Sequence, residues 1–436
     1  MSEWKHETVR ALCSHVIDCR NKTAPVVNYP TPYKMLRTSN IRNGFVDISS
    51  VRYVTKQTYD IWTSRGELED GDVIFTREAP LGEVGILRTA DGYFLGQRLV
   101  LFRSNPQKCY NWFLNYALLS PWIKNKICGS GGGSIVTHLR VPDCEEIQIR
   151  IPADLSEQRR IADTLRAIDE KIELNQQIND NLEAMAQALY DYWFVQFDFP
   201  DENGKPYKSS GGKMVWNELL KREIPEEWTC VMIQEMADVI GGSTPYTQDP
   251  DNFSKVNEFG IPWITPKDLS KSTDFYIAKG EVSITEKGRK EASLTYLPPG
   301  SILFSSRAPI GYVAIAADYV TTNQGFKSLA PLESESTPYL FFLMKSMVSY
   351  FEQAAGITTF KEVSGSLVKA AKIVRPPVSV LQKFFEVTEP IMNRRKATET
   401  EIKALTQQRD FLLPLLMNGQ VQVKPQGELN YHLADD

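Results

Sequence analysis

The sequence predicts an α+β protein in which one compact domain occurs twice and a long helix follows each copy. Three observations support this fold class: an internal repeat, two long stretches with helical periodicity, and short strand-like runs elsewhere. The predicted order is a first domain over 1–153, a central helix over 154–198, a loop over 199–224, a second domain over 225–377, a distal helix over 378–418 and a tail over 419–436. Such an order predicts a pseudo-twofold molecule.

The repeat is the observation on which this order depends. Residues 68–86 read LEDGDVIFTREAPLGEVGI, and residues 297–315 read LPPGSILFSSRAPIGYVAI, so the two align without a gap at an offset of 229. A period of about half the chain is far longer than the roughly 20–50 residues of a solenoid unit. The repeat therefore indicates a duplicated domain, with a mixed or barrel-like sheet in each copy. Two similar domains suit a target that itself has two halves.

The stretch 154–197 contains no Gly or Pro and predicts a helix of roughly 40 residues, about 60 Å long. A second helix is expected over 378–418, where Pro390 either kinks it or marks its true beginning. An antiparallel coiled coil would bury both apolar stripes. The alternative is that each helix packs on its own domain. The predicted seam residues are Ile161, Leu165, Ile168, Ile172, Leu182, Leu189, Leu381, Phe385, Ile402, Leu405 and Leu412.

Composition is that of an ordinary globular protein, with 42% hydrophobic residues and a net charge of −5. There is no apolar run of the roughly 18 residues that a membrane span needs, and no signal-peptide core, so we expect a cytoplasmic protein. The six cysteines form no C-x2-C pair and the four histidines are scattered, which argues against a zinc site.

The negative charge is concentrated in one segment: residues 154–198 hold 4 Lys+Arg against 10 Asp+Glu, whereas residues 1–150 hold 19 Lys+Arg against 15 Asp+Glu. Net charge therefore does not exclude DNA as a partner.

Catalytic motifs are missing from the sequence. There is no G-x-x-x-x-G-K-[ST] nucleotide-binding loop and no Asp/Asn-Pro-Pro-aromatic run. Nuclease-like Pro-Asp pairs occur at Pro142-Asp143 and Pro200-Asp201, but no acidic-x-Lys element follows either pair closely. We therefore predict no catalytic residue and no metal ligand in this chain.

Three segments together resemble a known family. They are PADLSEQRRIADTLRAIDEKIELNQQINDNLEAMAQALYDYWFVQF, GSILFSSRAPIGYVAIA with the following TTNQGFK, and the C-terminal QQRDFLLPLLMNGQV. They are similar to specificity subunits of type I restriction–modification systems, and the resemblance covers residues 10–423, nearly the whole chain. No single motif carries it.

The resemblance implies two target-recognition domains, each reading one half of a bipartite double-stranded DNA target. It implies that the helices set the gap between the half-sites and dock two methylation subunits, and that restriction subunits join in the full complex. The chain itself would be no enzyme and would bind no cofactor. S-adenosylmethionine, ATP and magnesium would belong to the partner subunits, which make the assembly a DNA adenine methyltransferase and ATP-dependent endonuclease.

Two other functions stay open at this point. One is a self-sufficient DNA methyltransferase or nuclease that carries recognition domains, which would need a cofactor motif. The other is a coiled-coil adaptor that binds protein only. The acidic, Asn- and Gln-rich faces of the 154–197 helix suit protein docking better than contact with phosphates.

Candidate DNA contacts are guanidinium, amide, hydroxyl and ammonium groups on predicted loops, since Arg pairs with guanine, Asn and Gln with adenine, and hydroxyls with phosphate. In the first domain they are Arg37, Ser39, Asn40, Arg77, Gln97, Arg98, Ser130 and Ser134. In the second they are Thr265, Lys267, Ser306, Arg307, Gln324, Thr358, Thr359 and Lys361. Each of them could instead brace the fold. Residues shared by both copies are better candidates for scaffold than for specificity, because two different half-sites need different readers.

The two copies of the repeat differ in where they place the basic residue among the candidate DNA contacts. Thr76-Arg77-Glu78 in the first copy aligns with Ser305-Ser306-Arg307 in the second, so the basic residue moves by one place. A DNA contact therefore cannot be transferred residue for residue between the halves.

Overall fold

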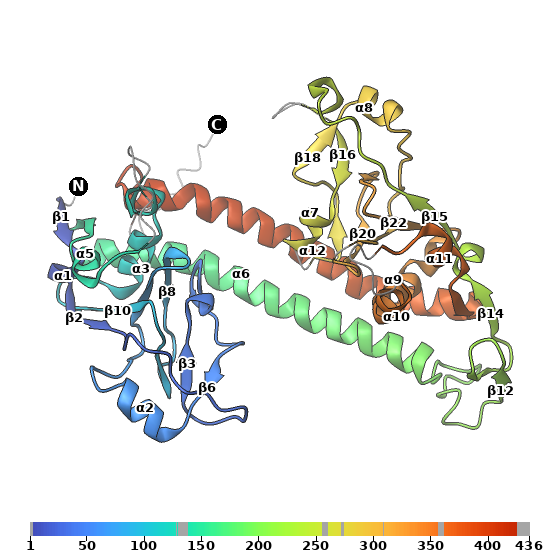
Figure 1. The fold of residues 1–436 in the computed structure, drawn as a ribbon, viewed down its shortest axis with the longest axis horizontal. Coiled ribbons are helices and arrows are strands. Elements are labelled where there is room, and N and C mark those ends of the chain that lie inside the picture. The colour runs from blue at the N-terminus through green and yellow to red at the C-terminus, as the bar shows by residue number, and fades with distance from the viewer. Residues whose placement is uncertain are drawn as a thin grey trace, which may run out of the picture. The chain divides into compact units, whose positions relative to one another are not determined.

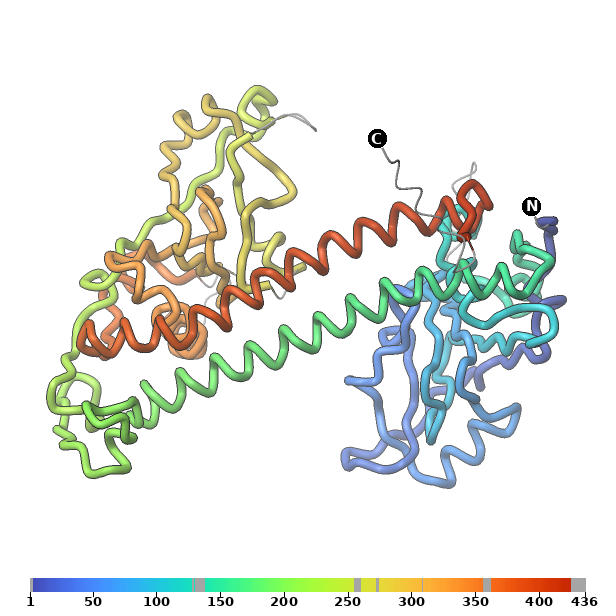
Figure 2. The backbone as a smooth tube through the Cα atoms, turned by 180° about the vertical axis from the view of Figure 1, so that it is seen from behind, coloured from blue at the N-terminus to red at the C-terminus, as the bar shows by residue number. Residues whose placement is uncertain are grey.

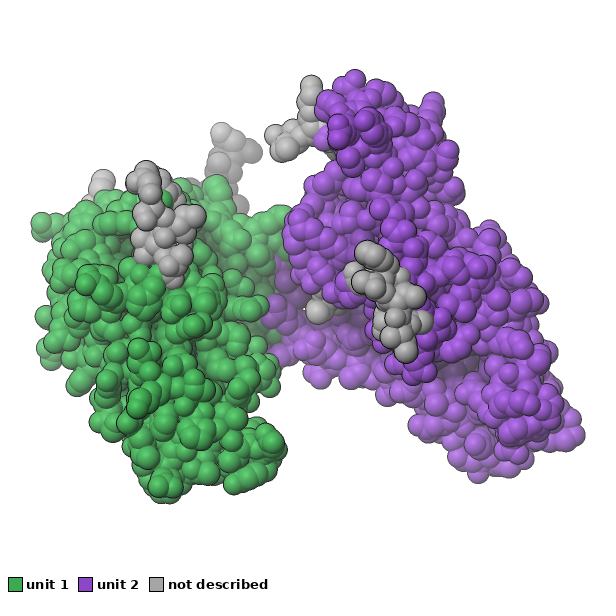
Figure 3. Space-filling model, in the orientation of Figure 1, with its two compact units in different colours: residues 1–173, 403–436 green, residues 174–402 purple. Residues whose placement is uncertain are grey.

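The computed structural model describes residues 3–127, 129, 138–254, 260–271, 274–307, 309–355 and 362–424. The chain forms two compact units, and each is built from residues far apart in the sequence (Figure 3). Unit 1 comprises 1–173 and 403–436, and unit 2 comprises 174–402. Each unit contains one copy of the predicted domain together with parts of both long helices.

Unit 1 is built around a six-stranded mixed sheet (Figure 1). Its strand order is β2 (Cys13–Asp18), β10 (Leu99–Ser104), β7 (Val73–Arg77), β8 (Leu81–Ile86), β5 (Gly44–Val46) and β4 (Ile41–Arg42). A second sheet has the order β6 (Arg52–Tyr53), β3 (Lys34–Leu36), β9 (Tyr93–Leu95), and a third pairs β1 (Trp4–Thr8) with β11 (Gln148–Pro152). The short helices are α1 (Val9–Leu12), α2 (Lys56–Trp62), α3 (Asn111–Leu119), α4 (Pro121–Ile127), α5 (Val141–Glu145) and the 3-10 turn η1 (Thr38–Asn40).

Unit 2 repeats this plan. Its main sheet has the order β15 (Ala237–Gly241), β22 (Lys327–Pro331), β19 (Ile302–Phe304), β20 (Val313–Ala316), β17 (Tyr276–Ile277). Smaller sheets join β18 (Val282–Ile284), β16 (Ile261–Ile264) and β21 (Thr321–Thr322), then β14 (Thr229–Met232) with β23 (Lys372–Arg375), and β12 (Met214–Asn217) with β13 (Arg222–Pro225). The helices are α7 (Pro266–Ser270), α8 (Glu286–Glu291), α9 (Thr337–Ser346), α10 (Val348–Ala354) and α11 (Gly365–Ala370), with 3-10 turns η3 (Ile233–Glu235), η4 (Pro250–Asn252) and η5 (Ser334–Ser336).

The sequence repeat corresponds to one structural hairpin in each unit. Strands β7 and β8 pair antiparallel with Val73 opposite Ile86, and β19 and β20 pair with Ile302 opposite Ile315, so both partners lie 229 residues further on. The repeated glycines explain part of the conservation between copies. Gly71 and Gly300 have φ of +88° and +86°, a backbone conformation that glycine adopts at little cost. The duplicated domain predicted from the sequence is therefore present as duplicated structure.

Two long helices complete the fold, and each is one continuous run in Figure 2. Helix α6 spans Leu155–Tyr190 and continues as a π-helical turn over Asp191–Val195; α12 spans Val378–Met417. Because α12 begins twelve residues before Pro390, the expectation that this proline marks the start of the helix is wrong. The predicted α+β class with two homologous domains and two long helices is confirmed.

The two helices run antiparallel where they meet in unit 2. Thr398 of α12 donates a hydrogen bond to Oδ1 of Asn179 on α6, and Arg395, less than a turn earlier, lies 3.1 Å from Glu183. In unit 1, Arg409 lies 3.0 Å from Asp169, and Leu416 joins the same core as Ile161 near the start of α6. In both units residues later in α12 therefore lie against residues earlier in α6, which is the antiparallel direction.

The seam between the helices is less apolar than the sequence pattern predicts. Ile161, Leu165, Ile172 and Leu381 are buried, whereas the other predicted seam residues are only partly buried: Ile168, Leu182, Leu189, Phe385, Ile402, Leu405 and Leu412. At the start of α12 the fully buried ring is Phe384, one residue before the predicted Phe385. Buried polar residues on α6 occupy much of the rest of the stripe: Gln158, Asp169, Asn175 and Asn179.

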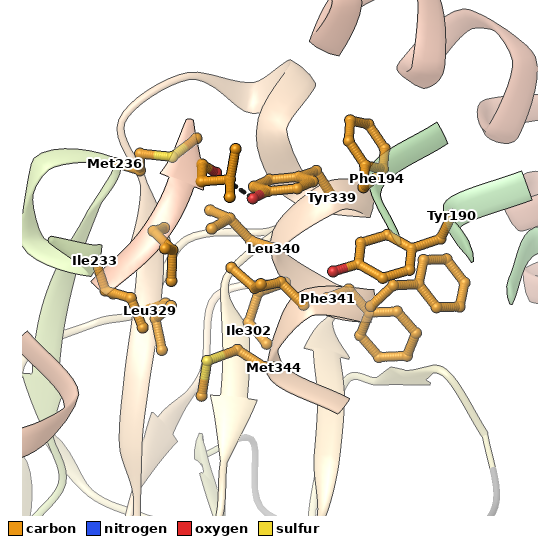
Figure 4. Close-up of a cluster of buried hydrophobic side chains, with 14 of the residues drawn as sticks. Tyr190, Phe194, Ile233, Met236, Ile302, Leu329, Tyr339, Leu340, Phe341 and Met344 are labelled. Carbon is orange, nitrogen blue, oxygen red and sulfur yellow. Dashed lines mark hydrogen bonds between the residues drawn. The ribbon is translucent and has the colours of Figure 1, made fainter. Parts of the chain in front are cut away.

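The core of unit 2 forms around α9, which is buried on almost every side. In Figure 4 Tyr339, Leu340 and Phe341 point from this helix between strand residues and the aromatic end of α6. Burial of each large side chain contributes about 1.5–3 kcal/mol. Tyr339 also donates a hydrogen bond to the carbonyl of Val374, which satisfies its buried hydroxyl.

We predict that Phe384→Ala lowers the free energy of unfolding of unit 2 by about 3–5 kcal/mol, because it leaves a cavity in a packed aromatic cluster. The Phe384 ring has no exposed surface, and its centroid lies 4.8 Å from that of Phe194. Phe411 on the same helix is 69% exposed, so Phe411→Ala is the matched control and should change stability by less than about 0.5 kcal/mol. Urea unfolding of the full chain checks both values, and equal losses would contradict the assignment of Phe384 to the core.

Candidate nucleic-acid interface

A hydroxyl group braces the turn of the repeated hairpin in each unit. In unit 1 the Thr76 hydroxyl donates to the carbonyl of Pro80 (2.5 Å) and accepts from the backbone N–H of Glu83 (2.9 Å). In unit 2 Ser305 makes the same two bonds with Pro309 and Tyr312. All three positions recur at the offset of 229. The same two hydrogen bonds of a hydroxyl group therefore brace the turn in both copies.

Several loops converge beside this turn in unit 1. The backbone N–H of Arg77 donates to the carbonyl of Arg98, and that of Leu139 donates to the carbonyl of Arg77. The N–H of Gly96 donates to the carbonyl of Leu36, which places the segment 37–40 beside the same loops. Loops from four parts of the sequence therefore form one end of the unit, which we call the loop end of unit 1: residues 36–40, 77–81, 96–98 and 138–139.

Unit 2 has a corresponding loop end, formed by residues 264–268, 305–307, 323–325 and 362–363. The backbone N–H of Ser306 donates to the carbonyl of Gly325, and that of Val363 donates to the carbonyl of Ser306. The N–H of Asn323 donates to the carbonyl of Ile264, as Gly96 does to Leu36 in unit 1. The described candidate DNA contacts thus lie at one loop end in each unit.

Arg77 and Arg307, predicted together, have different environments. Arg77 is 7% exposed, and its guanidinium lies 3.1 Å from the Asp18 carboxylate and donates to the carbonyl of Leu139. Its counterpart at the offset of 229 is Ser306, which is also buried and donates to the carbonyl of Gly325. The side chain of Arg307 is 45% exposed. In this conformation Arg77 and Ser306 brace the loops, and Arg307 faces solvent.

The exposed charges at the two loop ends are paired. In unit 1 Glu78 lies 3.3 Å from Arg98 and 3.5 Å from the ring of His138. In unit 2 Arg307 lies 3.1 Å from Glu362, and the guanidinium holds the pKa of that carboxyl below its ordinary value. All these side chains are more than a third exposed, so each pair contributes at most about 1 kcal/mol to stability. These side chains can therefore give up their ion pairs for contacts with a ligand at little cost in stability.

The predicted Arg37–Asn40 and Thr265–Asp268 segments form the same cap. Asn40 accepts from the N–H of Arg37, and Asp268 accepts from that of Thr265. Asn40 is fully buried, and its amide nitrogen donates to the carbonyl of Asp47, so it braces the loop here. Ser39 is exposed at the position equivalent to the exposed Lys267.

Three further predicted residues, Gln97, Gln324 and Lys267, each contact another side chain of their own unit. Gln97 accepts a hydrogen bond from the hydroxyl of Thr23, and Gln324 accepts one from Thr244, so the repeated glutamine has a repeated bracing contact. Lys267 shares Glu281 with Lys271, and the two ammonium groups lower the pKa of that carboxyl to about 2. The remaining predicted contacts lie outside the described residues: Ser130, Ser134, Thr358, Thr359 and Lys361.

Sequence reasoning missed three exposed polar residues of the loop ends, Glu78, His138 and Glu362. Carboxylates repel phosphates and so give no signal for a DNA contact, and a lone histidine gives none either. The ungapped repeat alignment does place Glu78 opposite Arg307, which was the available clue. Over the described ranges no three His, Cys, Asp or Glu residues cluster as metal ligands would. Within the same ranges, no helix has both the length and the apolarity needed to cross a bilayer.

Three comparisons with known proteins agree on the class. The family model for the type I restriction modification DNA specificity domain matches residues 25–184 and 225–407. The specificity subunit of the type I restriction enzyme MjaIX of Methanocaldococcus jannaschii is 42% identical over 186 residues, which are 41% of this chain and 41% of that relative. The HindI specificity subunit of Haemophilus influenzae is 23% identical over 97% of this chain and all of its own length. The solved S subunit of the type I system of M. genitalium shares the fold, with a TM-score of 0.57 and 16% identity over 95% of this chain and 96% of its own.

The duplicated fold and these matches define a protein with two DNA-specificity domains. The family model covers more than half of the sequence, so the chain belongs to the type I restriction–modification DNA specificity family. The predicted resemblance is therefore confirmed. Its role is DNA specificity, and the relatives named above are specificity subunits.

We predict that Arg77→Ala destabilises unit 1 by about 1–3 kcal/mol, because it removes a buried ion pair with Asp18 and a hydrogen bond to the carbonyl of Leu139. Arg307→Ala should change the stability of unit 2 by less than about 0.5 kcal/mol, since that side chain is half exposed. Thermal unfolding of the two variants checks the contrast. Equal losses would show that Arg307 is also a bracing residue.

Proposed function

We propose that each specificity domain reads one half of a bipartite double-stranded DNA target, through the loop end of its unit. The observation that carries this proposal is the pair of equivalent loop ends, which share bracing contacts but differ in their exposed side chains. Equivalent frames suit two duplex segments of the same general shape, and different exposed groups suit two different base sequences.

The two long helices set the gap between the half-sites and dock two methylation subunits in this proposal. The exposed polar faces of α6 and α12 support the docking role, because polar and ion-paired surfaces are common at the rims of protein interfaces. Restriction subunits join to form the full complex, which acts in the cytoplasm. S-adenosylmethionine, ATP and magnesium are bound by the partner subunits, and the assembly methylates adenine and cleaves DNA in an ATP-dependent reaction.

The direct test is methylome sequencing of the source cells with the gene intact and with the gene deleted. We expect deletion to abolish one methyladenine motif that consists of two specific half-sites and a fixed gap. Re-expression of the chain from a plasmid is the control and should restore the motif. A methylome that deletion leaves unchanged, in cells whose methylation subunit is expressed, would contradict the proposal and favour a protein-only adaptor.

The gap is tested by removing one heptad from each helix, residues 170–176 of α6 and 402–408 of α12. A seven-residue deletion keeps the 3/4 spacing of the buried stripe and shortens each helix by about 10 Å. We expect both half-sites to stay the same and the gap to shrink by one to about three base pairs, at about 3.4 Å per base pair. Altered half-sites with an unchanged gap would show that the helices do not set the spacing.

A further inference from the structure

One pair of equivalent exposed positions carries opposite charge in the two units. The residue that follows the braced strand end is Glu78 in unit 1 and Arg307 in unit 2, and the two are separated by the repeat offset of 229. The hydroxyl brace before this position is the same in both units, so the backbone presents the two side chains from equivalent places. The two positions therefore share this bracing contact and differ in the charge of their side chains.

The residue that faces this position also changes its chemical character. His138 precedes Leu139, whose N–H donates to the carbonyl of Arg77; Glu362 precedes Val363, whose N–H donates to the carbonyl of Ser306. His138 and Glu362 are thus equivalent. In unit 1 a carboxylate on the turn faces an imidazole and a guanidinium, and in unit 2 a guanidinium on the turn faces a carboxylate.

Two of the bracing contacts around these two positions are the same in both units. Gln97 and Gln324 both accept from a threonine, and Asn40 and Asp268 both accept from the first backbone N–H of their cap. A frame that positions two duplex segments must be the same in both copies, whereas residues that tell two sequences apart must differ. The reversal of charge between Glu78 and Arg307 occurs at positions that contribute little to stability, because exposed ion pairs contribute little to folding.

We propose that Arg307 and Glu78 are specificity-determining residues that occupy matching positions of the two half-sites. Arg307 leaves Glu362 and donates to O6 and N7 of a guanine in the major groove. Glu78 leaves Arg98 and accepts a hydrogen bond from the exocyclic N4 amine of a cytosine. The half-site of unit 2 then contains guanine at the place where that of unit 1 contains cytosine. This inference rests on the proposed function.

The test uses cells that lack the chromosomal gene and express the full chain from a plasmid together with its methylation subunit. Methylomes are compared for the wild-type chain, Arg307→Ala, Glu78→Ala and Lys213→Ala. Lys213 is the matched control, because it is an exposed cation of unit 2 that is paired with Glu226 outside the loop end. Thermal unfolding of each purified chain shows whether a variant is folded.

For Arg307→Ala we expect one guanine of a single half-site to become degenerate, with a loss of discrimination of about tenfold or more. For Glu78→Ala one cytosine of the other half-site should become degenerate, and Lys213→Ala should leave the motif unchanged. If both loop-end variants keep every position of the motif, with or without a uniform fall in methylation, the residues contact phosphate or nothing and the inference is overturned.

A second substitution decides the case in which Arg307→Ala abolishes methylation altogether. Arg307→Gln keeps a hydrogen-bonding side chain that matches adenine. A shift from guanine to adenine at one position supports the inference, whereas retained guanine or no methylation by a folded chain overturns it. If the wild-type chain itself restores no bipartite motif, the proposed function fails instead, so the two failures are distinguishable.

Discussion

Burial of polar groups between the two long helices is the constraint on which the rest of the structure depends. In unit 2 the guanidinium of Arg395 donates to Glu399 and to the carbonyl of Asn179, while Glu399 accepts from the backbone N–H of Phe275 in the domain. Burial raises the pKa of Glu399, and the hydrogen bonds oppose this effect. Such groups are stable inside a protein only when they are paired. The domain and both helices of unit 2 are therefore joined by one hydrogen-bonded network.

In unit 1 different residues pair the buried polar groups between the two helices. Asp169 of α6 accepts from the hydroxyl of Tyr116 in α3 (2.7 Å) and from Arg409 of α12 (3.0 Å). Burial raises the pKa of Asp169, and the hydrogen bonds from Tyr116 and Arg409 oppose this rise. A purely apolar stripe can slide along its partner by one heptad, whereas a buried ion pair can form in only one register. In each unit the polar seam thus fixes which turns of the helices meet, and so where the domain lies along them.

Much of this fold could be predicted from the sequence, because the strongest signals are local or repeated. The glycine-free periodic stretch gives α6, and the ungapped repeat gives the hairpin that centres each sheet. The distal helix expected over 378–418 corresponds to α12, but the sequence left open whether the helix begins at Pro390, since a proline often indicates a helix boundary and here lies inside the helix. Whether Phe384 or Phe385 enters the core depends on the rotation of the helix against its neighbours, which an apolar pair does not reveal.

The candidate site was predictable only in outline. The repeat led to loops that meet at one end of each unit, but which side chains face inward depends on packing partners such as Asp18, far away in sequence from Arg77. Asn40 likewise has the chemistry of an adenine reader, yet the structure uses it as a cap. Residue type alone does not separate a brace from a reader. Comparing the two copies identifies some braces, because Thr76 and Gln97 recur with their contacts as Ser305 and Gln324, whereas the brace Arg77 does not recur.

The central claim, that each domain reads its own half-site, is tested most directly by duplicating one domain. In the test chain, residues 225–377 are replaced by a second copy of residues 1–153, which is a segment of the same length. We expect methylome sequencing to find a target with two inverted copies of one half-site and the original gap. Persistence of the original asymmetric target, or a target in which neither half matches it, would contradict the account.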